Sequence, residues 1–285
     1  MPEKPQTEDS RTAALGPRKG LPAPLARAIE PAAFEPLEAP GPNDWLASHS
    51  EKGQTFLQFA RSNINRPNER RHTIYLQPLG TFGPDAPSLD FLRRYAAAFF
   101  MLDVKLLPPA ALDAKIRSRT NPYSGQHQLL TGDLLDLLRH RIPEDAFCII
   151  GITTEDLYPS ESWNFVFGQA SLTDRVGVYS FARYGGGTNE LTLRRSCKVL
   201  THETAHMFGM MHCIWNRCIL NGSNHLAETD ARPMHLCGVD LRKLHWSVRF
   251  DVVERYRRLR NLSLEAHFED EAQWIDTQLA RIQRH

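Results

Sequence analysis

The chain has 285 residues, of which 41% are hydrophobic, and its formal net charge at pH 7 is +1. A chain of this size and composition can bury a full core, and one catalytic domain with a loose leader fits it better than two domains. The near balance of charge argues against a nucleic-acid partner, because nucleic-acid binders usually carry a basic stripe.

Membrane and secretory signals are not found in the sequence. The longest apolar runs, at residues 95–102 and 146–152, fall well short of the roughly 18 residues that a membrane span needs. The N-terminus has no apolar core or small-residue cleavage site of a secretory signal. The five cysteines are an odd number and three of them cluster, which favours metal binding over a disulfide framework. We therefore expect a cytoplasmic protein without a membrane partner, with a monomer as the favoured state.

The N-terminal part of the chain is rich in Pro and Ala. Residues 1–43 show little hydrophobic periodicity, so we predict a largely disordered leader with a short helix near residues 25–29. Residues 45–61 have helical spacing and are expected to dock on the main body. The predicted organisation is therefore a leader at residues 1–43 and one folded domain at residues 44–285.

Strands and helices alternate through the middle of the chain. Ser88 and Thr131 are the residue types that cap helices, and each precedes an apolar periodic run. The predicted elements are, in order, a strand at 72–79, a helix at 89–101, a strand at 103–107, a helix at 132–141 and a buried strand at 147–153. Such alternation implies right-handed crossovers and therefore an α/β fold with a twisted, mostly parallel sheet.

Two short segments rich in aromatic and β-branched residues follow, at 164–171 and 176–184. The first could be an antiparallel edge strand, which would either pair with an extended peptide or simply complete the sheet. A helix is predicted at residues 191–208, and amphipathic helices at 250–259 and 271–282 are expected to pack outside the sheet.

The predicted helix at 191–208 ends in a metal-binding pattern. His202 and His206 are four residues apart, so a helix places them on one face, where both rings can bind one ion. Gly209 can adopt positive φ, end the helix and let His212 approach the same ion from a new direction. Three neutral histidines leave a fourth zinc position open, which is typical of a catalytic site. Glu203 can then accept a proton from a zinc-bound water.

The extended pattern HExxHxxGxxH marks the metzincin clan of zinc peptidases. Here it continues as Cys213, Cys218 and Cys237, and in this the chain resembles the archaemetzincins. Further blocks that look like those of the vertebrate archaemetzincins lie at residues 143–148, 162–174, 179–184 and 221–226. The resemblance covers about residues 71–256.

The resemblance implies a compact metzincin-like peptidase domain with an active-site helix and two zinc ions, one catalytic and one structural. The catalytic zinc would be held by His202, His206 and His212, with Glu203 as the general base. The structural zinc would be held by three cysteines and a fourth ligand, and the cysteines are Cys213, Cys218 and Cys237.

The chain departs from the family pattern at two positions. Asp240 stands where the family has its fourth cysteine. A carboxylate can bind zinc but should hold it less tightly than a thiolate, and His225 or His235 could serve instead. Leu220 replaces the methionine that packs beneath the catalytic metal; its similar volume should preserve the site, and Met234 is a less favoured substitute.

The predicted function is zinc-dependent hydrolysis of peptide bonds, through a zinc-bound water activated by Glu203, on a peptide or small-protein substrate. One alternative is a zinc-stabilised binding protein with weak or no turnover. Another is a zinc amide hydrolase with a non-peptide substrate, which the same chemistry would serve. Aminopeptidase and endopeptidase action both remain open at this point.

Overall fold

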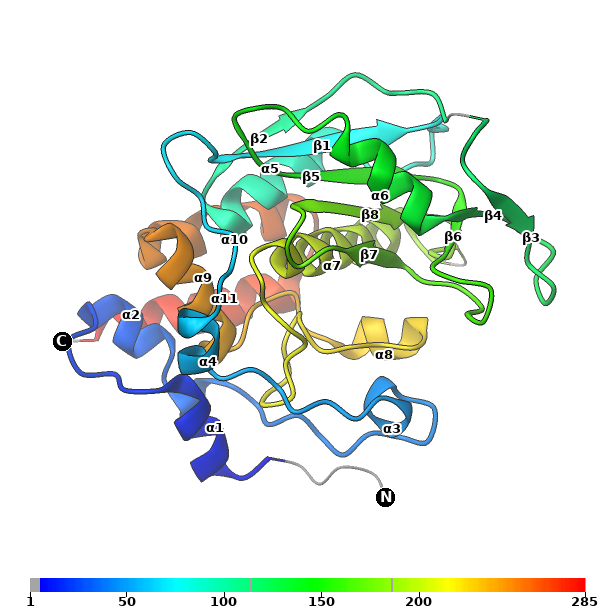
Figure 1. Ribbon diagram of the computed structural model, residues 1–285. Coiled ribbons are helices and arrows are strands. Elements are labelled where there is room, and N and C mark those ends of the chain that lie inside the picture. Colours follow the sequence, from blue (N-terminus) through cyan, green and yellow to red (C-terminus); the bar gives the residue numbers. More distant parts are fainter. Residues whose placement is uncertain (1–5, 113, 186, 285) are drawn as a thin grey trace. The chain divides into compact units, whose positions relative to one another are not determined.

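The structure is a computed structural model that describes residues 6–112, 114–185 and 187–284 (Figure 1). The chain divides into two units, which we call the sheet unit, Asn65–Gly209, and the helical unit, Met1–Ile64 with Met210–His285. None of the helices within the described ranges has the length and apolar character needed to cross a membrane.

The sheet unit contains a main sheet whose central strands are buried along their whole length. Its strand order is β2-β1-β5-β8-β7, and the bounds are Asp103–Leu106 for β2, Thr73–Leu79 for β1, Ala146–Thr153 for β5, Val176–Ser180 for β8 and Gly168–Ala170 for β7 (Figure 1). Strands β2, β1, β5 and β8 run parallel, and β7 pairs antiparallel with β8 at the edge. The predicted α/β class, with a mostly parallel sheet and an antiparallel edge strand, is confirmed.

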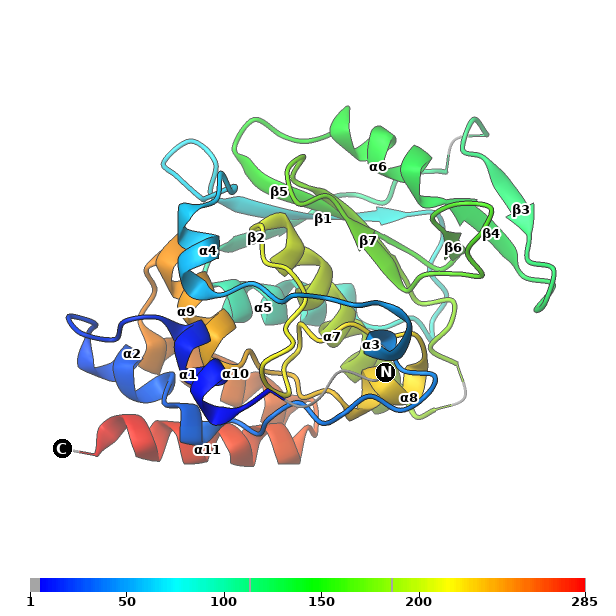
Figure 2. The same cartoon turned by 60° about the horizontal axis from the view of Figure 1, so that its bottom comes forward.

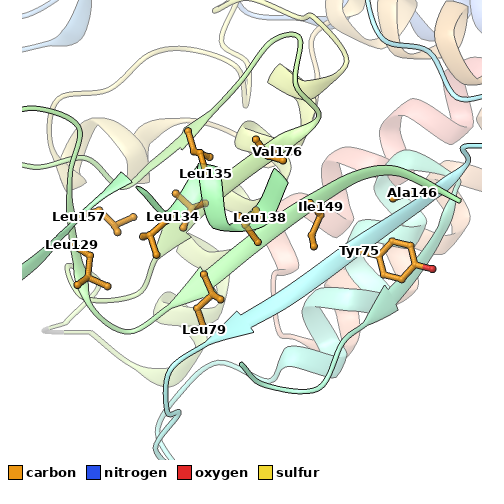
Figure 3. Close-up of a cluster of buried hydrophobic side chains, with 11 residues drawn as sticks. Tyr75, Leu79, Leu129, Leu134, Leu135, Leu138, Ala146, Ile149, Leu157 and Val176 are labelled. Atoms are coloured by element: carbon orange, nitrogen blue, oxygen red, sulfur yellow. The ribbon is translucent and has the colours of Figure 1, made fainter. Parts of the chain in front are cut away.

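Helices cover both faces of this sheet. Figure 2 shows α6 (Thr131–Arg139) on one face, and α5 (Leu89–Phe100) and α7 (Asn189–Met207) on the other. Leu134 and Leu138 of α6 are fully buried in a cluster with Ile149 and other side chains of the sheet (Figure 3). On the opposite face, Phe208 lies 4.2 Å from Phe147, measured between ring centroids. The end of α7 is therefore fixed against the central strand.

The two predicted helix caps have different outcomes. The Ser88 hydroxyl accepts a hydrogen bond from the Phe91 amide at 3.2 Å, which confirms this cap. The Thr131 prediction is wrong, because Thr131 is the first residue inside α6 and its hydroxyl is buried. That hydroxyl instead donates to the side chain of Gln169 and lies 3.3 Å from the Tyr158 carbonyl, so it ties α6 to the strands rather than capping the helix.

A second, smaller sheet in the sheet unit was not predicted. It has the order β3-β4-β6, with β3 at Ser118–Thr120, β4 at His127–Leu130 and β6 at Asp156–Tyr158. The buried Asp156 forms an ion pair with Arg183 at 2.7 Å and accepts from Gln128 at 2.7 Å. These strands are short and partly polar, so they lack the alternation that reveals a strand in the sequence.

Helices dominate the helical unit. Two of them confirm the predicted C-terminal helices, α10 (Val252–Glu265) and α11 (Glu269–Gln283). Helix α9 (Gly238–Val248) was not predicted, because it buries Asp240, Arg242 and Lys243 and so shows no clean amphipathic pattern. The remaining helices here include α3 (Trp45–Ser48), α4 (Phe56–Arg61) and α8 (Leu226–Ala231). The predicted helix at 45–61 is thus interrupted, with Gly53 at φ +67° between its two parts.

The leader contains more structure than its composition suggested. Its described residues form α1 (Glu8–Leu15), α2 (Ala23–Ala28) and the 3₁₀ turn Pro31–Ala33, so the expectation of a largely disordered segment is corrected for this part. Leu15, Leu25 and Ile29 are buried. Arg242 of α9 donates to the backbone carbonyls of Leu15 and Pro17. A buried arginine on a distant helix therefore supplies order that the local sequence does not reveal. Residues 1–5 lie outside the described part of the chain.

Candidate metal centres

Helix α7 presents two histidines to one point in the sheet unit. The helix starts after Thr188, whose hydroxyl accepts from the Leu191 amide at 3.2 Å. His202 and His206 lie one turn apart, and their Nε2 atoms are 3.1 Å from each other. Two nitrogens bound to one tetrahedral zinc are about 3.3 Å apart. The α7 pair therefore fits a shared ion without a change of rotamer.

Glu203 lies between the two histidines in the sequence and is 7% exposed. Its side chain passes directly over Gly168 on the edge strand β7: a Cβ at position 168 would lie 2.7 Å from Glu203 Cγ. Sequence reasoning did not single out Gly168. The signal was available, because a glycine inside a strand often marks a close approach by another group.

Gly209 directly follows the C-cap of α7 and ends this helix as predicted. Its φ is +79°, in the left-handed region, and its amide donates to the His206 carbonyl at 2.8 Å. The chain then enters the helical unit at Met210.

His212 lies in the helical unit, beside residues that sequence reasoning did not connect with it. Its Nδ1 is 2.7 Å from the Glu51 Oε1 atom, and its ring meets Trp45 edge-on with centroids 5.2 Å apart. Glu51 follows α3 by three residues and gave no sequence signal, because one isolated glutamate among loop residues carries no pattern. That His212 shares an ion with the α7 pair stays a prediction.

A second cluster, which we call the cysteine cluster, lies within the helical unit and consists of Cys213, Cys218, Cys237 and Asp240. Each contributes one ligand atom, and these atoms lie within 4.8 Å of one another. The Sγ atoms of Cys213 and Cys237 are 3.6 Å apart, and Asp240 Oδ2 is 3.3 Å from Cys218 Sγ. All five cysteines in the described residues are reduced. The structure thus brings together the three predicted cysteines with the aspartate that replaces the fourth.

Burial governs the electrostatics of the cysteine cluster. It raises the pKa of the Cys213 and Cys218 thiols well above the usual value, and it raises the pKa of the Asp240 carboxyl to about 6. Burial also opposes ionisation of Cys237, but hydrogen bonds from the other two thiols lower its pKa below the usual value. The buried Lys243 ammonium donates to Asp240 at 2.8 Å. Thiols and a carboxylate excluded from water form a donor set that suits zinc.

The two histidines considered as alternative ligands are engaged elsewhere. His235 stacks on Trp274 with centroids 3.4 Å apart and contacts Glu271 at 3.1 Å. His225 Nε2 is 3.1 Å from Asp44, and its Nδ1 accepts from the first turn of α8. Neither belongs to the cysteine cluster, which leaves Asp240 as the side chain next to the three thiols.

At the position where a methionine was expected, the chain has Leu220. Leu220 is fully buried, and its carbonyl accepts from the Cys213 amide at 2.8 Å. Its backbone is therefore paired with the residue that follows His212. That the Leu220 side chain fills the place of the family methionine, with Met234 as the less favoured substitute, stays a prediction.

Known proteins resemble this chain in sequence and in structure. A family model described as "Peptidase family M54" matches residues 100–246. Archaemetzincin-2 of Macaca fascicularis is 41% identical, covering 82% of this chain and 76% of that protein. Archaemetzincin-1 of Mus musculus is 37% identical, covering 76% and 51%. The crystal structure of archaemetzincin from Methanopyrus kandleri aligns with a TM-score of 0.54 and 30% identity, covering 65% of this chain and 99% of that one. The structure from Archaeoglobus fulgidus, complexed with malonate, gives 0.51 and 27%, covering 60% and 99%.

Proposed function

The chain belongs to peptidase family M54, the archaemetzincins, and from this premise we propose that it cleaves peptide bonds with Glu203 as the general base. Membership makes it a zinc metallopeptidase, a hydrolase whose substrates are peptides or proteins. The alignment with curated relatives spans most of the chain, so the assignment does not depend on the zinc motif alone.

The proposed ligands of the catalytic zinc are His202, His206 and His212. The observation that carries this is the 3.1 Å separation of the Nε2 atoms on α7. His212 follows Gly209 by three residues, a stretch of chain that spans at most about 11 Å. Its ring is therefore tethered near the end of α7 by the chain itself. When bound, zinc lowers the pKa of a coordinated water towards about 7 and polarises the scissile carbonyl as a Lewis acid.

Glu203 carries the proton through the proposed reaction. Its carboxylate accepts a proton from the attacking water as the water oxygen bonds to the carbonyl carbon, and it then delivers this proton to the leaving nitrogen as the C–N bond breaks. The close approach of Glu203 to Gly168 supports a role for β7 in binding, because an extended peptide paired with this edge strand would lie beside the carboxylate.

The proposed structural zinc ligands are Cys213, Cys218, Cys237 and Asp240. Their burial and mutual distances support the assignment. Together these side chains would join the loop after His212 to the start of α9, since Cys237 is the residue before that helix.

Glu203→Gln tests the proposed mechanism. The amide cannot accept the proton, so we expect hydrolysis to fall about 10²- to 10⁴-fold while zinc content stays unchanged. Cleavage of a peptide library, mapped by mass spectrometry, measures the rate, and elemental analysis measures the zinc.

The matched control is Glu190→Gln, which changes an exposed glutamate on the same helix and should preserve activity. Cleavage by wild type that is no faster than cleavage by Glu203→Gln would overturn the proposal. If neither protein cleaves the library, a zinc-stabilised binding protein is favoured.

A further inference from the structure

We propose that Glu51 is a positioning residue for the catalytic zinc, because its carboxylate holds the His212 ring in the orientation and tautomer that a zinc ligand needs. The inference rests on the proposed function, since it takes His212 as a ligand. It assigns a role at the metal centre to a part of the chain that precedes the residues matched by the family model, 100–246.

The contact between Glu51 and His212 defines the tautomer. Glu51 Oε1 lies 2.7 Å from His212 Nδ1. An ionised carboxylate can only accept, so Nδ1 carries the proton and Nε2 carries the lone pair that binds metal. The His212 side chain is 19% exposed and the Glu51 side chain is 24% exposed, which limits screening of the interaction by water.

Trp45 holds the Glu51 carboxylate in place. The Trp45 Nε1 atom donates to the same Oε1 oxygen at 2.9 Å, and the Trp45 backbone amide donates to Glu228 at 2.9 Å. The indole packs against Gly222 so closely that a Cβ there would lie 2.3 Å from the ring. The carboxylate is thus oriented by an indole that is itself anchored at two further points, and its alignment with His212 does not depend on an ion.

A carboxylate behind a metal-binding histidine fixes the ring and raises the basicity of the ligating nitrogen. Removal of such a partner typically costs 10- to 100-fold in metal affinity or activity. Because Glu51 would act through the His212 ring, we expect the effect to fall on zinc affinity and kcat rather than on KM.

The test compares zinc affinity across full-length variants by competition with a chromogenic chelator. The His212→Ala variant identifies which of the measured affinities belongs to the catalytic site. We expect Glu51→Ala to weaken that site about 10- to 100-fold. Glu51→Gln retains an acceptor oxygen without the charge, and should lie between wild type and Glu51→Ala. At saturating zinc, Glu51→Ala should lower kcat and leave KM near the wild-type value.

Glu35→Ala is the matched control, because it removes another N-terminal glutamate, one that pairs with Arg217 at 2.7 Å and is 73% exposed. It should leave zinc affinity unchanged. If His212→Ala weakens the site but both Glu51 variants bind zinc as wild type does, the inference is overturned and the proposed function stands. If His212→Ala itself leaves zinc affinity unchanged, the ligand set of the proposed function fails. Should Glu51→Ala fail to fold, the near-isosteric Glu51→Gln decides by the same criterion.

Discussion

At the scale of single residues, Asp240 has two partners that make different demands. Its Oδ2 lies 3.3 Å from Cys218 Sγ, while Oδ1 accepts from Lys243 at 2.8 Å. Both members of the ion pair are at most 1% exposed. A thiolate in this position would leave the Lys243 ammonium without its carboxylate, so the lysine offers a physical reason for a carboxylate at position 240.

Asp240→Ala should therefore destabilise the protein strongly even without metal. Loss of one partner of a buried pair costs about 3–5 kcal/mol, whereas an exposed pair contributes about 0–1 kcal/mol. Asp276→Ala removes an exposed pair with Arg260 and provides the comparison. Urea unfolding in the presence of a chelator measures both free energies. Similar values for the two variants would contradict the buried pair as a stabilising unit.

At the scale of elements, the edge strand β7 connects the sheet to the proposed chemistry. Gly168 pairs with Tyr179 of β8, and its missing side chain makes room for Glu203. A strand was predictable here from the aromatic and β-branched residues at 165–167, although β7 itself covers only the Gly-Gln-Ala stretch that follows them. Its closeness to the general base was not, because that depends on how α7 packs against the sheet.

Gly168→Ala should lower kcat about 10- to 100-fold, because a shift of about 1 Å in a catalytic group can cost 10²-fold in rate. The added Cβ would collide with the Glu203 side chain and displace it. Zinc content should be unaffected, since the histidines are not touched. Gly132→Ala on α6, where a Cβ meets no other atom within 4 Å, is the control. Wild-type kcat in Gly168→Ala would show that Glu203 adapts without loss.

At the scale of the whole molecule, the parts predicted from the sequence are those with local patterns. Strands β1 and β5 are short runs rich in apolar residues, α5 is amphipathic, and the histidine and cysteine spacings identify the metal-binding chemistry. The leader, α9 and Glu51 were missed because their order comes from partners far along the chain, such as Arg242 for the leader carbonyls. A division into a leader at 1–43 and a peptidase domain at 44–285 stays a prediction, but the leader's described helices belong to the helical unit.

Arg242→Ala should loosen the leader. The side chain is 6% exposed and binds the Leu15 and Pro17 carbonyls, next to trypsin sites at Arg18 and Lys19. We expect cleavage there to become severalfold faster, because a backbone must leave its hydrogen bonds before a protease can bind it. Limited proteolysis followed by mass spectrometry measures the rate, with Arg260→Ala, an exposed arginine, as control. Unchanged cleavage would show that other contacts hold the leader.

His212 and Cys213 are neighbours in the chain, and on the proposed assignment each serves a different ion. Their Cα atoms are held about 3.8 Å apart by a single peptide bond, so neither can move far alone. Oxidation of the cysteine cluster would therefore displace His212 as well as the structural ion. On this assignment, an oxidant of thiols would silence hydrolysis without touching Glu203 or the substrate.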